Sequence, residues 1–180
     1  MTKYKLICTV SLAIITINLA NAQNNNIVID CSHPLASLHT TNIDSALIIQ
    51  WAEKAAMQTF ALEAPKLDTQ MHLLKTCYTD QGWKSFNDAF KKSGNLDVIK
   101  HEQLSMSSLI DGKTTVESKQ ENQWKVSIPM QITYQNSKQK INQSLLVNLL
   151  IGRKLSGEFG IMQIIAQAQR SKEGSLPHQP

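Results

Sequence analysis

Apolar and polar residues alternate along residues 124–151, and this pattern predicts a long antiparallel hairpin. In the first half the apolar positions are Trp124, Val126, Ile128, Met130, Ile132 and Tyr134. The second half continues the alternation with Ile141, Leu145, Val147, Leu149 and Ile151, and residues 135–139 supply a polar turn. Successive strand side chains point to opposite faces, so each strand presents one apolar face to a core. Pro129 falls in the outward-facing set and cannot donate a ladder hydrogen bond, which indicates a bulge or an edge there.

Apolar residues at helical spacing predict three helices before this hairpin. Asp44 can cap the first, over residues 45–62, and Pro65 can open the second. Thr79 can cap the third, which runs to Lys92 and ends at Ser93 and Gly94. The buried sides of the three helices are expected to include Leu47, Trp51 and Ala55, then Leu67, Met71 and Leu74, then Trp83, Phe86, Ala89 and Phe90.

Three further strands are expected around the hairpin. Leu104 and Met106 begin a first strand, Asp111 and Gly112 make a tight hairpin turn, and residues 114–120 form a second strand. Residues 161–168 form the last strand, after a glycine-containing loop at 152–160. Helices followed by a meander of strands predict an α+β fold, in which the helices pack on the concave face of a curved antiparallel sheet.

The N-terminal residues 1–22 have the layout of a secretory signal peptide. Lys3 and Lys5 precede an apolar run at residues 6–19, and Ala20 and Ala22 form a small-x-small cleavage site before Gln23. A helix over the apolar run would span roughly 21 Å, which is short of the roughly 30 Å hydrocarbon core of a bilayer. Cleavage is therefore expected, and an uncleaved membrane anchor is the alternative.

The remaining segments outside the folded domain are polar. Residues 23–42 are expected to form an extended arm, residues 43–168 a single domain, and residues 169–180 a flexible tail. If the leader is removed, Cys31 in the arm and Cys77 are the remaining cysteines. One disulfide between them is expected outside the cytoplasm, and two separate thiols are the alternative. Closing a loop of about 46 residues would stabilise the fold by roughly 3 to 4 kcal/mol.

Charge and side-chain chemistry exclude several functions. The net charge is +4, and loss of Lys3 and Lys5 leaves 16 basic against 14 acidic residues. These basic residues are scattered, which argues against a nucleic-acid partner. Residues 124–151 contain no Asp, Glu or His, so Tyr134 is the one titratable group expected on their inward face. Without a paired acid and base, a metal-ligand set or a phosphate-binding loop, we expect no catalysis, no cofactor and no metal.

Several motifs together resemble the IcmL/DotI family of Dot/Icm type IVB secretion components, which includes TraM-like proteins. The motifs are Trp51-Ala52-Glu53-Lys54-Ala55, Tyr78-Thr79-Asp80-Gln81-Gly82-Trp83 with Phe86 and Phe90, residues 93–96, Trp124-Lys125-Val126-Ser127-Ile128-Pro129-Met130 with Tyr134, and Gly160-Ile161-Met162-Gln163. Tyr78 stands where the family usually has Phe. The resemblance covers residues 43–168 and implies a cone-shaped α+β domain that is nuclear-transport-factor-like, or cystatin-like. Most of its motif residues are expected to pack in the core: Trp51, Tyr78, Gly82, Trp83, Trp124, Pro129, Tyr134 and Gly160.

The resemblance implies a non-catalytic scaffold or protein-interaction module related to secretion or conjugation subunits. Core members of the family resemble inner-membrane proteins with a transmembrane helix, whereas only five residues precede the short apolar run here. We therefore expect a free periplasmic or secreted relative, with inner-membrane anchoring as the alternative. Expected partners are proteins of the cell envelope or secretion machinery, and homo-oligomers are allowed. The competing hypothesis is a small apolar-ligand carrier or minor enzyme that uses the cone's cavity near Tyr134 and Met130.

Overall fold

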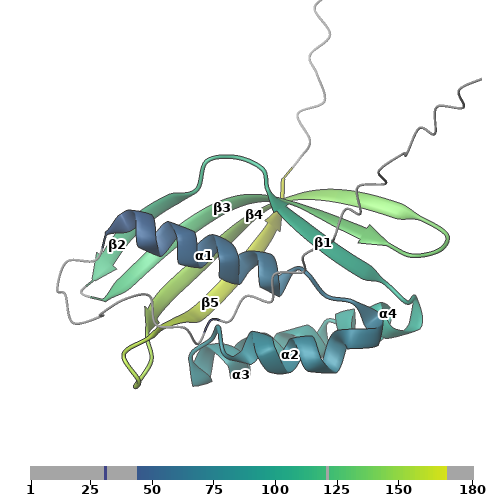
Figure 1. Ribbon diagram of the computed structural model, residues 1–180, viewed down its shortest axis with the longest axis horizontal. Coiled ribbons are helices and arrows are strands. Elements are labelled where there is room, and N and C mark those ends of the chain that lie inside the picture. Colours follow the sequence, from purple (N-terminus) through teal and green to yellow (C-terminus); the bar gives the residue numbers. More distant parts are fainter. Residues whose placement is uncertain (1–30, 32–43, 121, 170–180) are drawn as a thin grey trace, which may run out of the picture.

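A curved antiparallel sheet carries the helices on one of its faces (Figure 1). The computed structural model describes Cys31, residues 44–120 and residues 122–169. Over these ranges the α+β class and the curved sheet are confirmed. The leader, most of the arm and the tail after residue 169 lie outside the described residues. No helix within the described ranges is long and apolar enough to cross a bilayer.

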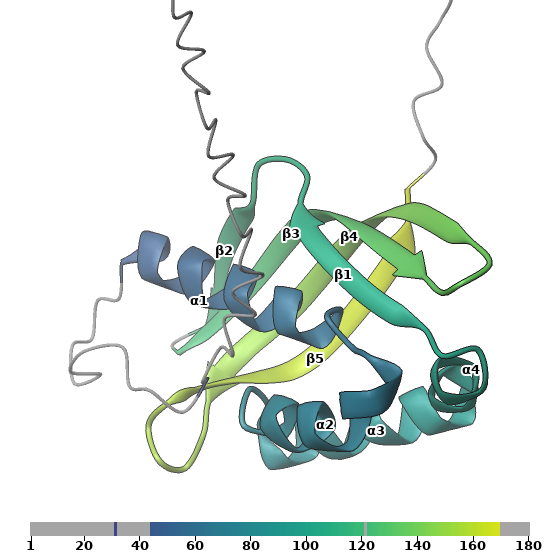
Figure 2. The same cartoon turned by 45° about the vertical axis from the view of Figure 1, so that its right-hand side comes forward.

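The helices precede the strands along the chain, as the sequence pattern predicts. The helical layer consists of α1 (Ser45–Thr59), a short 3-10 helix η1 (Ala64–Lys66), α2 (Leu67–Lys75), α3 (Asp80–Lys92) and α4 (Asn95–His101). The sheet consists of β1 (Ser105–Ile110), β2 (Thr115–Gln120), β3 (Gln123–Gln135), β4 (Lys140–Arg153) and β5 (Phe159–Ala168). The strand order is β1-β3-β4-β5, and β2 also pairs with β3. Figure 2 shows α4 at the end of the helical layer that is next to β1.

Both predicted N-caps are present. The Asp44 carboxylate accepts a hydrogen bond from the Ala46 amide at 2.9 Å, and α1 begins at the next residue, Ser45. The Thr79 hydroxyl accepts one from the Gly82 amide at 3.1 Å and so caps α3. These side chains satisfy amides that have no partner inside the helix.

Substitution Thr79→Ala should destabilise the domain by about 1 kcal/mol, because the cap of α3 is lost. Thr79→Ser keeps the hydroxyl and should recover most of that loss. The free energy of unfolding of both variants in urea measures the difference. Equal destabilisation by serine and alanine would show that the methyl group of Thr79, and not its capping hydroxyl, is what matters.

The helical layer contains a fourth α-helix that the sequence pattern does not predict. Gly94 has φ +75°, so it ends α3 in a left-handed turn and at the same time precedes the first residue of α4. The seven residues of α4 are too few to show a clear helical period. The first helix also ends earlier than expected, at Thr59.

The expected tight hairpin at Asp111 and Gly112 is wrong. β1 pairs with β3 from Met130 to Gln135, while β2 pairs with β3 between Gln123 and Ser127. The two short strands therefore lie end to end along one edge of β3. The connection between them is held from the helical side, because the Thr114 hydroxyl donates to the Glu53 carboxylate of α1.

Pro129 occupies the point of β3 that faces this interruption. Its carbonyl accepts a hydrogen bond from the Asp111 amide at 2.8 Å. Because the N and O of one residue point to the same side of an antiparallel strand, the missing Pro129 N–H faces the gap between β1 and β2. β3 has no bulge here and pairs regularly with Leu146 of β4 on its other side. The neighbouring strand is interrupted instead, so no ladder donor is lost.

The core lies between the concave face of the sheet and α1. The alternating positions of the hairpin are fully buried there, apart from its ends: Val126, Ile128, Met130, Ile132, Val147, Leu149 and Ile151. They meet Ile48, Ala52 and Ala55 of α1. Ile141 departs from the prediction, since half of its surface is exposed. It lies near the tip of the β3–β4 hairpin, which extends past the helices (Figure 1).

Candidate functional site

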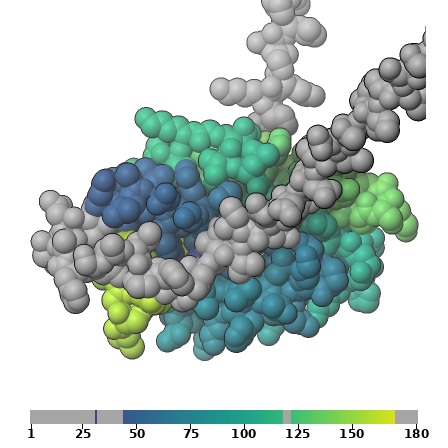
Figure 3. Space-filling view, in the orientation of Figure 1, coloured from purple at the N-terminus to yellow at the C-terminus, as the bar shows by residue number. Residues whose placement is uncertain are grey.

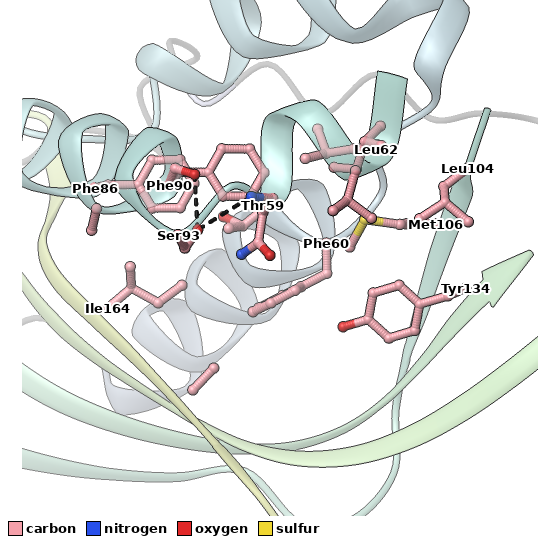
Figure 4. A pocket seen from close by; sticks show the side chains of 15 residues that line it. Thr59, Phe60, Leu62, Phe86, Phe90, Ser93, Leu104, Met106, Tyr134 and Ile164 are labelled. Atoms are coloured by element: carbon pink, nitrogen blue, oxygen red, sulfur yellow. Dashed lines mark hydrogen bonds between the residues drawn. The ribbon is translucent and has the colours of Figure 1, made fainter. Parts of the chain in front are cut away.

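A cavity of about 480 Å³ lies between the sheet and the α3–α4 end of the helical layer. Figure 4 shows side chains from α1, α3 and the strands converging on it. Most of the lining is hydrocarbon, from residues that include Phe60, Leu62, Phe86, Phe90, Leu104, Met106 and Ile164. A cavity of this size and chemistry suits an apolar small molecule.

Three hydroxyl groups also line the cavity, those of Thr59, Ser93 and Tyr134. Thr59 Oγ1 donates to the Ala55 carbonyl at 2.9 Å, and Ser93 Oγ donates to the Phe90 carbonyl at 2.9 Å. Among the described residues, no hydrogen-bond partner of the Tyr134 hydroxyl is found. Among the three hydroxyl groups, that of Tyr134 therefore remains able to orient a guest, and the side-chain amide of Asn95 is the other polar group of the lining.

The cavity lacks the groups that general acid–base catalysis requires. Its lining contains no Asp, Glu, His, Lys, Arg or Cys. Burial raises the pKa of the Tyr134 phenol above its ordinary value, so the phenol stays protonated near neutral pH and can donate a hydrogen bond. Within the described ranges, no cluster of three His, Cys, Asp or Glu residues could hold a metal ion. The arrangement supports binding and offers no base for proton abstraction.

Tyr78 and Gly82 meet Gly160 at one contact in the structure, although Gly160 lies about 80 residues further along the sequence. The Ile161 amide donates to the Cys77 carbonyl at 2.9 Å, and the Thr79 amide donates to the Ile161 carbonyl at 3.1 Å. Residues 77–79 thus form a short parallel bridge beside the start of β5. We call this contact the β5 joint.

Both glycines of the β5 joint are required by close approach of the backbone. A Cβ on Gly82 would lie 2.1 Å from the Ile161 carbonyl oxygen. A Cβ on Gly160 would lie 2.9 Å from the Thr79 amide nitrogen. Gly82 and Gly160 therefore allow α3 to cross close over β5. This crossing positions α3, which forms one wall of the cavity.

Tyr78 starts an aromatic row that continues along α3. Its ring stacks on Phe86 with centroids 5.0 Å apart, and Phe86 stacks on Phe90 at 5.4 Å. Trp83 meets Tyr78 edge-on at 5.8 Å. Burial raises the pKa of the Tyr78 phenol well above its ordinary value, and its hydroxyl lies 3.3 Å from that of Thr59. These contacts place Tyr78 and Trp83 in a packing role.

Trp51 and Trp124 belong to a second aromatic cluster, centred on Phe159. The ring of Phe159 lies 5.8 Å from that of Trp51 and 5.5 Å from that of Trp124, both in edge-to-face geometry. The Arg153 guanidinium lies 5.5 Å from the Phe159 ring. Phe159 is not expected to be a core residue from the sequence pattern, which places it in the loop at 152–160. The cluster joins α1, β3 and β5 at the end of the sheet opposite the cavity.

A disulfide links Cys31 to Cys77, with the two Cα atoms 4.9 Å apart. Both residues are buried, and Cys77 Sγ lies 3.3 Å from Gln58 Oε1 of α1. The bond attaches Cys31 to the helical layer beside the β5 joint. Figure 3 shows this helical face of the molecule, with α1 in blue and the α2–α3 layer in blue-green.

Met130 and Tyr134, the two residues expected beside a cavity, lie in different surroundings. Met130 is buried in the core but is not among the cavity-lining residues, whereas Tyr134 is. The expected cleavage residues Ala20, Ala22 and Gln23 lie outside the described residues. Most of the cavity lining, such as Phe60, was not predicted, because no sequence period separates core residues from residues around a void.

The fold matches several solved structures of secretion components. An IcmL-like type IV secretion system protein from Legionella pneumophila gives a TM-score of 0.69 at 16% identity, covering 72% of this chain and 96% of that one. The periplasmic domain of DotI gives 0.66 at 24% identity, covering 71% and 98%. A periplasmic fragment of TraM gives 0.61 at 17% identity, covering 71% and 100%. At these identities the likeness establishes the fold.

Family membership follows from the sequence match. No curated protein matches this chain. The model of one family, described as a type-IV b secretion system inner-membrane complex component, matches residues 5–167. That match contains both aromatic clusters, the β5 joint and the cavity. This chain therefore belongs to the DotI/IcmL family of type IVB secretion system components.

Proposed function

We propose that this protein is a non-catalytic, periplasmic protein-interaction module that acts in or beside a type IVB secretion apparatus. The observation that carries the proposal is the family match over residues 5–167, which includes all but the last two described residues. The cavity adds support, because its lining holds no acid–base pair. The family's motif residues are used for packing at the β5 joint and in the aromatic clusters, so partners would be recognised through the surface.

A periplasmic location is the second part of the proposal. The structures of DotI and TraM that resemble this chain are both of periplasmic parts. We propose that the leader is cleaved after Ala22, which leaves residues 23–42 as an arm in front of the domain and residues 169–180 as a tail. The mass and N-terminal sequence of protein isolated from the periplasm test this directly. Gln23 at the N-terminus supports cleavage, and a retained apolar run would establish the anchored alternative.

Cross-linking in intact cells tests the interaction role. A C-terminally tagged chain, cross-linked gently before lysis, should recover subunits of a type IVB apparatus in defined stoichiometry. The matched control is an exported, tagged protein of unrelated fold at the same abundance. Recovery of the same proteins with both baits, or of none with this chain, would contradict the proposal.

The cavity favours one further candidate function, a carrier of small apolar molecules. If a lipid-like guest occupies the cavity, Ala89→Trp should displace it, because Ala89 lines the cavity from α3. Lys84→Trp is the matched control, since Lys84 is exposed on the same helix and is not part of the lining. Native mass spectrometry of gently purified protein should show a bound mass that is lost in Ala89→Trp and kept in Lys84→Trp. No bound mass in the unaltered protein would remove this candidate.

A further inference from the structure

The outer edge of β5 presents backbone groups that nothing in the described structure covers. β5 is the last strand in the order β1-β3-β4-β5. The Gln169 amide donates to the Ser144 carbonyl of β4, so backbone groups at alternate residues before it, at 168, 166 and 164, point away from β4. Among the described residues, only the start of this edge is paired, where residues 77–79 bond to Ile161.

This edge also lacks the features that normally prevent strand pairing. Residues 160–168 contain no charged residue and no proline. Natural edge strands usually carry a lysine, a proline or a bulge that blocks a second strand. The single register shift between β4 and β5 lies at Leu150 and Ile151, before the free stretch begins. Ala166 and Ala168 are exposed, so the free stretch is open to another chain.

We propose that β5 pairs in antiparallel fashion with β5 of a second copy of this chain, about a two-fold axis at Ala166. The inference rests on the proposed function, because it identifies how the interaction module assembles. With Ala166 on the axis, Ile164 lies opposite Ala168 of the second copy. The three outward-facing residues of each strand would then exchange their backbone hydrogen bonds pairwise.

The chemistry of the strand favours its own copy as the occupant. Self-pairing brings identical side chains together, so a charged edge would repel itself, whereas residues 160–168 are uncharged. On the concave face, the pairing sets Ala166 against its equivalent and Ile164 against the small Ala168. On the other face it sets Ile165 against Gln167. Nearly half of the Ile165 surface is exposed in the single chain and would be partly covered by this pairing.

Pairing at this edge would also affect the cavity. Ile164 and Ala166 contribute to its lining, so the cavities of two copies would lie close to the shared axis. The paired strands would join two sheets into one, which is a self-complementary interface of the kind that closes a two-fold dimer. A second copy would therefore satisfy the free backbone groups of the strand that lines each cavity.

Sedimentation of the exported protein tests the pairing. We expect a concentration-dependent dimer for the unaltered chain. Ala166→Lys places two ammonium groups on the axis, and Ala166→Pro removes an outward amide without breaking a bond to β4. Each should raise the dimer Kd at least tenfold while leaving the melting temperature nearly unchanged. Ser107→Lys, exposed on β1 at the opposite side of the sheet, is the matched control and should dimerise normally.

A cysteine cross-link gives a readout that does not depend on the stability of the variants. Ala166→Cys should form an intermolecular disulfide on mild oxidation, because paired Cα atoms near an axis lie about 5.5 Å apart. Ser107→Cys should stay monomeric. A monomer at all concentrations, or a dimer unaffected by both Ala166 variants, would overturn the proposal. If Ala166→Lys is monomeric but still captures the same envelope proteins as the unaltered chain, the proposed function does not require self-pairing. If the unaltered chain captures no envelope protein, the proposed function is rejected, whatever its oligomeric state.

Discussion

Substitution Gly82→Ala is expected to destabilise the domain by about 3 kcal/mol or more, in spite of the higher helix propensity of alanine. The added Cβ would lie 2.1 Å from the Ile161 carbonyl oxygen, a backbone atom that cannot rotate away. Either α3 must move off β5 or the hydrogen bonds of the β5 joint must break. A shift of α3 would also disturb the cavity wall and the aromatic row on the same helix.

Chemical denaturation of Gly82→Ala measures this effect, with Gly94→Ala as the matched control. Gly94 has a left-handed backbone conformation, with φ +75°, which favours glycine. Unlike at Gly82, a Cβ added there would have no atom within 4 Å. Gly94→Ala should therefore cost only about 1 kcal/mol for the left-handed conformation. If helix propensity governed position 82, alanine there would stabilise the protein, and that result would refute the close-packing role of Gly82.

Loss of the Cys31–Cys77 disulfide should lower the free energy of unfolding by roughly 3 to 4 kcal/mol. The bond closes a loop in the unfolded chain, so its loss raises the conformational entropy of the unfolded state. The bond spans 46 residues and holds Cys31 beside Gln58 of α1. For a domain of this size, the melting temperature should fall by roughly 10 to 15 °C in the presence of a reductant.

The double variant Cys31→Ala with Cys77→Ala provides the control for the reductant. Its melting temperature should be low with and without reductant, since no bond remains to be broken. Calorimetry of the periplasmic protein measures both. An unaltered chain whose melting temperature is the same under oxidising and reducing conditions, and whose two thiols react with an alkylating reagent, would show that the bond does not form in the exported protein.

These two predictions concern the same region of the molecule. The disulfide and the β5 joint both involve the short segment at Cys77, which connects α2 to α3 and lies beside the first residues of β5. Lys154 strengthens this region, because its amine donates to the Thr76 carbonyl and lies 3.8 Å from the Glu158 carboxylate. Burial lowers the pKa of Lys154, and the charge of Glu158 opposes that effect. The helical layer is thus fixed to the sheet at the end of the cone opposite the β3–β4 turn.

Local sequence signals were sufficient to predict several helices and strands. The alternation in residues 124–151 specified β3 and β4, and Asp44 and Thr79 specified the starts of two helices, because periodicity and capping act within a few residues. The motifs also identified the family and the α+β class. They did not reveal α4, whose few residues have no clear period, or the separate pairing of β1 and β2 with β3.

The location of a candidate site, in contrast, depends on contacts between segments that are distant in sequence. The cavity depends on how α3 crosses the sheet, and that crossing depends on the contact between Gly82 and Ile161, two residues far apart in the chain. The free edge of β5 likewise depends on strand order, which no run of residues encodes alone. Long-range packing makes both features, since each requires that segments distant in sequence be brought together before the void or the unpaired edge exists.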